Sequence, residues 1–357
     1  MSHSRAATTE GGWGEVSTEM ADTRPVVLVV TDFLSQRLDH LAALSPAFRV
    51  EHRRSEEITE VLWRDVEVLY TFTTLPAPAQ APKLRWIQLF TAGADHVFRH
   101  PIGGCPVAVT SVSGVHAVAM AEYVFGMLLA WHHRIPALLE WQASGEWPPE
   151  RERMTRFVPR SEIWEQTLGI VGYGSVGRQI ARVGQGLGMK VLAVQRSGGK
   201  QDRGFILPGA GDPEGSIPAR YYRPAALGEM LPHCDVVVLS VPLTPETRGS
   251  FGETALRAMK RHAVLVNVAR GGVCDEAALL RALQEQWIGA AILDVFAQEP
   301  LPPDSPFWRL PNVLMSPHTS GHSRLYETRA AQVFAENLRR YAAGQPLLNV
   351  IDRDLNY

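Results

Sequence analysis

Three titratable side chains follow apolar, β-rich runs in the second half of the chain. Arg270 comes directly after one run, Glu299 shortly after the next, and His318 shortly after a third. In open sheets of parallel strands, ligands bind beyond the carboxyl ends of the strands. A guanidinium, a carboxylate and an imidazole gathered there would suit a small anionic substrate with a carbonyl group, because the guanidinium matches a carboxylate and the imidazole exchanges protons.

A glycine-rich turn is a second, independent signal. The string Thr167–Gly177 contains G-x-G-x-x-G directly after an apolar strand and directly before an apolar-periodic helix. The three glycines allow a tight turn, a close approach of the backbone to a pyrophosphate, and close packing of the helix on the strand. The start of the helix offers free N–H groups to phosphates. We therefore expect dinucleotide binding at Gly172, Tyr173, Gly174, Ser175, Val176 and Gly177.

The end of the next predicted strand favours NADP over NAD. An acid that binds the ribose is expected about 20 residues after the glycine turn. The sequence has Gln195 there, followed by Arg196 and Ser197. A carboxylate would repel a 2′-phosphate, whereas a guanidinium and a hydroxyl attract one. We expect NADP; the alternative, in which Arg196 is a solvated surface residue and NAD is used, stays open.

Apolar runs of strand length alternate with helix-like stretches, which indicates an α/β architecture. Most runs are continuously apolar, as expected of parallel strands buried on both faces. Ten strands are many for one open sheet, and a long break between 112 and 167 predicts two sheets. The ten runs are Val26–Val30, Val66–Phe72, Leu84–Phe90, Val107–Val112, Thr167–Val171, Lys190–Gln195, Val236–Val241, Ala263–Ala269, Ala290–Phe296 and Val313–Ser316.

The break and the C-terminal helix predict a discontinuous first domain. Helices are expected at about Val115–His133 within the break and at Ser323–Ala343, where the second would pack back onto the first domain. We predict a substrate domain at 25–110 and 319–357, a dinucleotide-binding domain at 111–318, and a site in the cleft between them. Residues 1–24 are expected to be a disordered extension, and 197–218, with six glycines and three prolines, a surface loop.

Composition narrows the classes of function. Among 357 residues, 35 Lys and Arg balance 37 Asp and Glu, which argues against a general nucleic-acid partner. The longest mostly apolar stretch, Ala117–Trp131, is too short to cross a membrane and contains Glu122. The three cysteines are far apart and no metal-ligand spacing is present, so neither disulfides nor a metal site is expected. The first residues do not resemble a signal peptide, so cytoplasm is the expected location.

Five strings occur in the order found in D-isomer-specific 2-hydroxyacid dehydrogenases, which the chain resembles over about residues 66–350. That family includes glyoxylate/hydroxypyruvate reductases, phosphoglycerate dehydrogenase and D-lactate dehydrogenase. The resemblance implies two doubly wound parallel-sheet domains, with a Rossmann domain inserted into a discontinuous flavodoxin-like substrate domain, and a homodimer built through the inserted domain. The strings are Thr167–Gly177, Pro242–Thr247, Asn267–Gly272, Asp294–Leu301 and Ser316–Gly321.

The resemblance also implies a role for each residue of the site. Arg270 would bind the substrate carboxylate and carbonyl, and His318 would exchange a proton with the carbonyl oxygen. Glu299 would hydrogen-bond the other ring nitrogen and stabilise the protonated ring. The backbone N–H groups of Ala92 and Gly93 would face the carboxylate, and hydride would come directly from the cofactor. Further cofactor contacts are implied for Gln195, Arg196, Ser197, Pro242, Thr247, Val268, Ala269, Asp294, His318 and Gly321.

We therefore expect an NADPH-preferring reductase of a small 2-oxo acid such as glyoxylate or hydroxypyruvate. Two alternatives stay open: a dinucleotide-sensing corepressor of the same fold, and a phosphoglycerate or other D-2-hydroxyacid dehydrogenase that uses NAD. A formate or phosphite dehydrogenase is disfavoured, since the formate branch pairs its histidine with Gln and this chain has Glu299. Asp294 has a second interpretation as a buried structural acid, and the other histidines, including His116, are expected to be structural or exposed.

Overall fold

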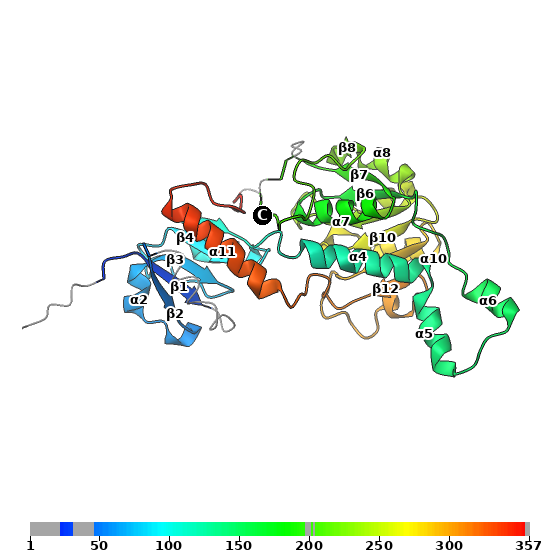
Figure 1. Cartoon of the computed structure of the whole chain (residues 1–357), viewed down its shortest axis with the longest axis horizontal. Coiled ribbons are helices and arrows are strands. Elements are labelled where there is room, and N and C mark those ends of the chain that lie inside the picture. Colours follow the sequence, from blue (N-terminus) through cyan, green and yellow to red (C-terminus); the bar gives the residue numbers. More distant parts are fainter. Residues whose placement is uncertain (1–21, 31–45, 197–200, 203, 354–357) are drawn as a thin grey trace, which may run out of the picture.

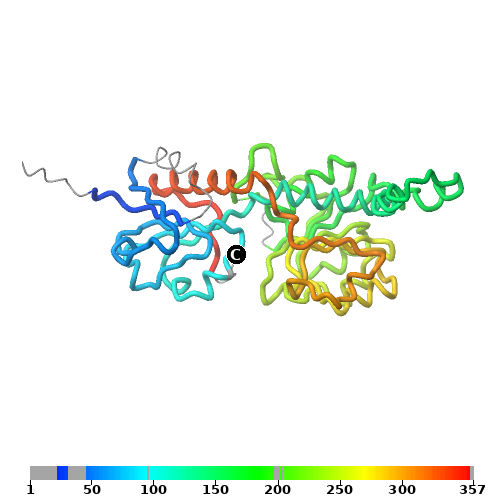
Figure 2. The backbone as a smooth tube through the Cα atoms, turned by 90° about the horizontal axis from the view of Figure 1, so that it is seen from below, coloured from blue at the N-terminus to red at the C-terminus, as the bar shows by residue number. Residues whose placement is uncertain are grey.

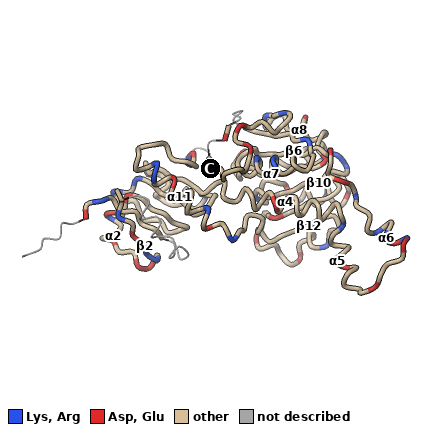
Figure 3. The backbone as a smooth tube through the Cα atoms, viewed as in Figure 1, with Lys and Arg blue, Asp and Glu red and all other residues tan. Residues whose placement is uncertain are grey.

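The computed structural model describes residues 22–30, 46–196, 201–202 and 204–353, so most of the predicted extension at 1–24 lies outside the described residues. The described chain contains two parallel sheets, which form two separate lobes (Figure 1). Lys and Arg are interspersed with Asp and Glu over both lobes (Figure 3). No helix in the described part of the chain is long and apolar enough to cross a membrane.

The smaller sheet has the strand order β2-β1-β3-β4-β5, the flavodoxin-like arrangement that was predicted. Beside it lie two short helices, α2 (Glu60–Asp65) and α3 (Asp95–Phe98). The C-terminal helix α11 (Tyr326–Ala342) packs across one face of this sheet, where the Phe334 ring stacks on Tyr70 with 4.3 Å between ring centroids (Figure 1). The strands are β1 Val26–Val30, β2 Arg49–His52, β3 Val66–Thr71, β4 Trp86–Leu89 and β5 Ala108–Thr110.

The larger sheet has the order β12-β11-β10-β9-β6-β7-β8. Counted from β6, this is the Rossmann order 3-2-1-4-5-6 with one more parallel strand, so the predicted fold class is confirmed. Its connections reverse direction between β6 and β9, where ligands bind in such sheets. The strands are β6 Thr167–Val171, β7 Lys190–Val194, β8 Arg220–Tyr222, β9 Val236–Leu239, β10 Val264–Asn267, β11 Ala290–Leu293 and β12 Val313–Met315.

Helices cover both faces of the larger sheet because alternate strand residues point to opposite sides. Val236 and Val238 of β9 face α4 (Ala117–His132) and α7 (Ser175–Gly186), whereas Val237 and Leu239 face the opposite helices. These opposite helices are α8 (Leu227–Met230), α9 (Glu253–Ala258) and α10 (Glu276–Gln284). Short 3-10 helices lie at Ser55–Glu57, Pro101–Gly104, Pro224–Ala226, Leu231–His233, Gly271–Val273 and Pro306–Arg309.

Several elements differ from the prediction. Strands β2 and β8 were not predicted, because β2 is polar and only half-buried and β8 is the short run Arg-Tyr-Tyr with one buried residue. Two helices after α4 were not predicted either, α5 (Ile135–Ser144) and α6 (Glu150–Arg156), and they extend away from the larger sheet (Figure 2). Within the predicted surface loop, the described residues form no helix or strand, but Gly211 and Asp212 are buried against α7. The exact domain boundaries remain a prediction.

Candidate active site

The structure brings His318 and Glu299 together at the edge of the larger sheet. Glu299 follows β11 and His318 follows β12, and these strands are parallel neighbours whose carboxyl ends lie side by side. Nδ1 of His318 is 2.7 Å from Oε2 of Glu299, and the two side chains are 47% and 37% exposed. Since the carboxylate accepts, Nδ1 donates, and Nε2 is the ring nitrogen that could exchange a proton with a substrate.

A buried carboxylate holds the loop that carries His318. Asp294 is 1% exposed, and its Oδ1 accepts from Ser316 Oγ at 2.5 Å and from Thr319 N–H at 2.8 Å. Its Oδ2 accepts from Ser320 Oγ at 2.5 Å. His318 has a left-handed backbone with φ of 55°, and its N–H donates to the Asp294 carbonyl at 2.8 Å. Such a conformation is costly for a residue other than glycine, so the surrounding bonds must impose it.

Arg270 comes three residues after the neighbouring strand β10, and its loop lies directly against the Glu299 loop. The next residue, Gly271, is so close to this loop that a Cβ there would be 1.9 Å from the carbonyl carbon of Phe296. Only glycine permits this approach. The Arg270 side chain is exposed, and its Nη1 donates to the Ala269 carbonyl at 2.8 Å. Its guanidinium therefore lies at the same sheet edge as the His318–Glu299 pair.

The glycine turn has the geometry that dinucleotide binding requires. Gly172 has φ of 103°, and a Cβ there would meet the backbone of Ser240 at 2.8 Å. A Cβ on Gly177 would lie 2.2 Å from the Gly172 carbonyl oxygen, because α7 packs closely against the turn. A Cβ on Gly174 would meet nothing within 4 Å, so this side of the turn is open at the start of α7. These residues fit a pyrophosphate at the helix N-terminus.

The predicted ribose-binding residues lie beyond β7. Gln195 is half-buried and Arg196 is exposed, while Ser197 lies outside the described residues. In the turn at 242–247, Thr247 Oγ1 donates to the Pro242 carbonyl at 2.6 Å. The pKa of Glu246 is lowered by hydrogen bonds from Thr244 and its own backbone and by the charge of Arg196. Arg196 therefore lies within electrostatic reach of this turn.

The remaining predicted contacts are spread around this edge. Val268 and Ala269 are buried at the end of β10, and Gly321 follows the His318 loop. Ala92 and Gly93 lie in the turn after β4 of the smaller sheet, where Thr91 Oγ1 donates to the Gly93 carbonyl at 2.6 Å. Among the described residues, no hydrogen bond joins this turn to Arg270 or His318. The substrate role of the turn therefore remains a prediction.

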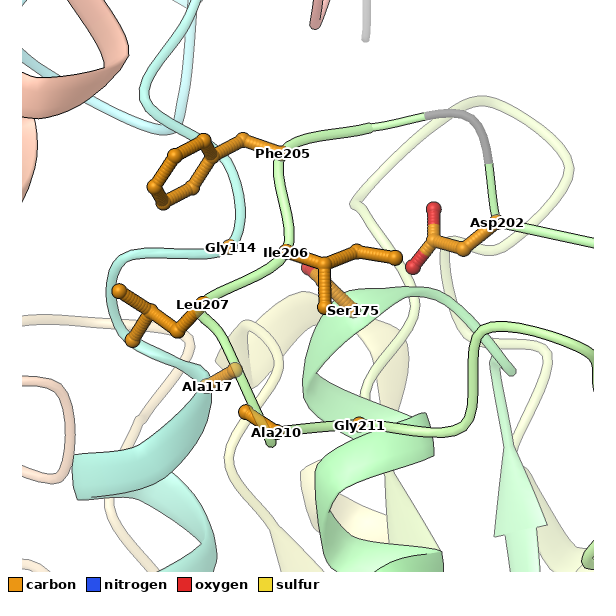
Figure 4. Close-up of a pocket in the computed structure, with 9 residues that line it drawn as sticks. All are labelled: Gly114, Ala117, Ser175, Asp202, Phe205, Ile206, Leu207, Ala210 and Gly211. Carbon is orange, nitrogen blue, oxygen red and sulfur yellow. The ribbon is translucent and has the colours of Figure 1, made fainter.

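The described residues between 201 and 219 cover the start of α7, which no sequence pattern indicated. Tyr173 Oη donates to Asp212 at 2.6 Å, and Arg178 Nη1 donates to the Asp212 carbonyl at 2.5 Å. A cofactor contact of Tyr173 would therefore come from its backbone. Phe205 N–H donates to Asn349 Oδ1 at 2.9 Å, which ties the segment to the C-terminal part of the chain. Figure 4 shows this segment facing Gly114, Ala117 and Ser175 across a small pocket.

Several known proteins resemble this chain over most of its length. The NAD-binding domain of the D-isomer specific 2-hydroxyacid dehydrogenases matches residues 125–320. A glyoxylate reductase from Korarchaeum cryptofilum is 34% identical over 299 residues, covering 82% of this chain and 84% of that protein. A D-isomer specific 2-hydroxyacid dehydrogenase from Xanthobacter autotrophicus, solved with NADPH and MES, superposes with a TM-score of 0.74 at 29% identity, covering 94% of this chain and all of that one.

A third neighbour is an NADPH-dependent glyoxylate/hydroxypyruvate reductase from Sinorhizobium meliloti, solved with NADP and sulfate. It superposes with a TM-score of 0.69 at 28% identity and covers 94% of this chain and 100% of its own. The fold and site define a dinucleotide-dependent oxidoreductase with two lobes. The chain belongs to the D-isomer specific 2-hydroxyacid dehydrogenase family. It is an NAD(P)-dependent enzyme acting on the CH–OH group of its donor.

Proposed function

We propose that this enzyme reduces a small 2-oxo acid, glyoxylate or hydroxypyruvate, to the D-2-hydroxy acid and that it prefers NADPH. The observation that carries the proposal is the 2.7 Å contact between His318 and Glu299, beside Arg270 and at the same sheet edge as the glycine turn. The printed names of the glyoxylate reductase from Korarchaeum cryptofilum and the reductase from Sinorhizobium meliloti support this choice of substrate.

Each residue of the site has one task in this reaction. When bound, the nicotinamide cofactor would supply the hydride that adds to the carbonyl carbon and would itself become the oxidised dinucleotide. Arg270 binds the substrate carboxylate with its forked N–H groups. His318 donates the Nε2 proton to the carbonyl oxygen, which becomes the hydroxyl, and takes a proton back from solvent. Glu299 keeps Nδ1–H as the donor on the far side of the ring and balances the charge of the protonated imidazole.

Turnover tests the reaction. The purified protein is mixed with NADPH and either glyoxylate or hydroxypyruvate, and the absorbance of NADPH is followed. His318→Ala should lower kcat by about 10²–10⁴ because it removes the general acid. His233→Ala is the control, since His233 is exposed before β9, at the opposite edge of the sheet. Cofactor binding without any turnover would instead favour the dinucleotide-sensing alternative.

The preference for NADPH rests on the residues after β7. Gln195 has no charge to repel a 2′-phosphate, and the exposed guanidinium of Arg196 follows it. Arg196→Ala should lower kcat/KM for NADPH by about 10- to 100-fold and change kcat/KM for NADH little, since only NADPH carries the phosphate. Arg261→Ala, which removes an exposed cation elsewhere, is the control. A wild-type preference for NADH would overturn this part of the proposal.

A homodimer is the expected assembly. The arm formed by α5 and α6 extends from the body of the molecule (Figure 2) and exposes apolar side chains that a partner would cover. Trp147 is 77% exposed, Met154 67% and Leu139 60%. Light scattering after gel filtration should give twice the mass of the 39.4 kDa chain. Trp147→Ser should weaken the dimer, whereas Trp308→Ser, at an exposed tryptophan in the 3-10 helix Pro306–Arg309, should not.

A further inference from the structure

One face of helix α4 contacts both ends of the loop that carries His318. His116 and Tyr123 are two helical turns apart at the start of α4, so their side chains lie on the same face. Tyr123 Oη is 2.6 Å from Ser316 Oγ, and His116 Nδ1 is 2.9 Å from the Gly321 carbonyl oxygen. Ser316 comes two residues before His318 and Gly321 three residues after it. The helix therefore forms hydrogen bonds with the loop on both sides of His318.

The direction of these hydrogen bonds follows from their neighbours. Ser316 Oγ donates its proton to Asp294 Oδ1 at 2.5 Å, so toward Tyr123 it can only accept. The chain of donors therefore runs from Tyr123 through Ser316 to Asp294, the carboxylate beneath the loop. Burial raises the pKa of Tyr123 to about 12, which keeps this donor protonated at physiological pH. Ser316 serves as a link between the helix and the buried acid.

The second contact has an equally defined direction. A backbone carbonyl only accepts, so Nδ1 of His116 carries the proton that Gly321 receives. The His116 ring packs against Tyr326, with 4.8 Å between ring centroids. Burial, helped by the charges of Arg270 and His322, lowers the pKa of His116. The ring is thus a neutral, packed donor. Tyr326 in turn donates to the Phe90 carbonyl, next to the predicted substrate turn.

We propose that His116 and Tyr123 are positioning residues that clamp the His318 loop and so set the reach of the general acid. The proposal rests on the proposed role of His318. The loop needs such a clamp, because His318 keeps a left-handed backbone that costs energy unless its surroundings hold it. α4 also packs against α7, the helix of the glycine turn. One rigid helix therefore fixes the acid relative to the site where the cofactor is expected.

Substitutions that change one hydrogen bond at constant shape test the clamp. Tyr123→Phe removes only the hydroxyl, and we expect kcat to fall about tenfold with KM for NADPH unchanged, because small misplacements of a reacting group are costly. His116→Leu should act in the same way. His116→Asn should restore most of kcat, since its amide nitrogen is as many bonds from the backbone as Nδ1. Tyr341→Phe, whose hydroxyl donates to Glu67 at 2.8 Å in the smaller lobe, is the matched control.

A readout without substrate separates this proposal from the proposed function. With ¹⁵N-labelled histidine, the Nδ1–H signal of His318 is identified by its absence in His318→Ala. It should exchange with water several-fold faster in Tyr123→Phe than in the wild type or in Tyr341→Phe. If the Nδ1–H proton of His318 exchanges as slowly in Tyr123→Phe and His116→Leu as in the wild type, and kcat is unchanged in both, the proposed positioning role is wrong. If no 2-oxo acid is turned over by the wild type, the proposed function fails, and the exchange rate alone decides on the clamp.

Discussion

Both carboxylate oxygens of Glu299 are committed, Oε2 to His318 Nδ1 at 2.7 Å and Oε1 to the Phe296 N–H at 2.9 Å. Each of the two oxygens faces an N–H donor, so the side chain at this position must offer two acceptors. An ionised carboxylate provides two acceptors, whereas an amide provides one acceptor and one donor. A glutamine at this position would leave one of the two donors unsatisfied. The carboxylate therefore fixes the orientation of the imidazole relative to the Phe296 backbone.

Glu299→Gln should shift the pH dependence of reduction toward acid. Without the negative partner the protonated imidazole is less stable, so the active acid form is lost at lower pH as the pH rises. The pH at which kcat for the oxo acid falls by half should therefore decrease in the variant. The measurement is a kcat profile with saturating cofactor from pH 5 to 9. If the kcat profile of the variant has the same pH midpoint as that of the wild type, Glu299 does not balance the charge of the imidazole.

Arg270→Lys should impair substrate binding more than cofactor binding. Lysine keeps the charge but loses the fork that pairs with a carboxylate in two hydrogen bonds. We expect KM for the 2-oxo acid to rise about 10- to 100-fold, the loss of one strong charged hydrogen bond, while KM for NADPH stays within about twofold. Steady-state kinetics with each substrate varied in turn measures both constants. An equal rise in both would show that Arg270 supports the nucleotide site instead.

The C-terminal helix should be essential to the smaller lobe. Phe334 of α11 is fully buried and contacts Tyr70 and Trp86, with centroid distances of 4.3 Å and 5.6 Å. Phe334→Ala should lower the free energy of unfolding by about 3–5 kcal/mol, because it leaves a cavity between helix and sheet. Denaturant unfolding followed by tryptophan fluorescence measures the loss. Val61→Ala, at a side chain that is 71% exposed, should change the stability by less than about 0.5 kcal/mol.

The location of residues that follow a strand was predictable, because parallel strands bring their carboxyl ends to the same end of the sheet. This holds for any conformation of the connecting loops. The continuous apolar runs before Arg270, Glu299 and His318 were enough to place these residues together. The polar strand β2 was not predictable in this way, since its place at the edge of the sheet leaves it half-buried and without an apolar signal. The hydrophobic pattern of a sequence therefore detects strands that are buried on both faces and misses half-buried strands at the side of a sheet.

The hydrogen bonds that orient the site residues could not be predicted from the sequence, for a different reason. Tyr123 and Ser316 are 193 residues apart, and nothing in either local pattern indicates that they meet. The hydrogen bond between Tyr173 and Asp212 was equally unpredictable, because a buried acid in a glycine- and proline-rich segment belongs to no periodic pattern. His116 was expected to be structural or exposed, and its bond to Gly321 is what connects it with the loop that carries His318. Long-range pairs of polar groups depend on the packed fold.

Asp294→Asn should separate the two interpretations of this buried acid. Its carboxylate accepts from Ser316, Thr319 and Ser320, whereas an amide would direct N–H groups at some of these donors. If holding the loop is its main task, kcat should fall about tenfold or more, unfolding should become easier by about 1–3 kcal/mol, and KM for NADPH should stay nearly constant. Asp235→Asn is the control, because that carboxylate bonds Lys260 and the Thr167 N–H at the opposite edge of the sheet. It should cost similar stability and leave kcat intact. A large rise in KM for NADPH in Asp294→Asn, with kcat retained, would instead support a direct contact with the nicotinamide amide.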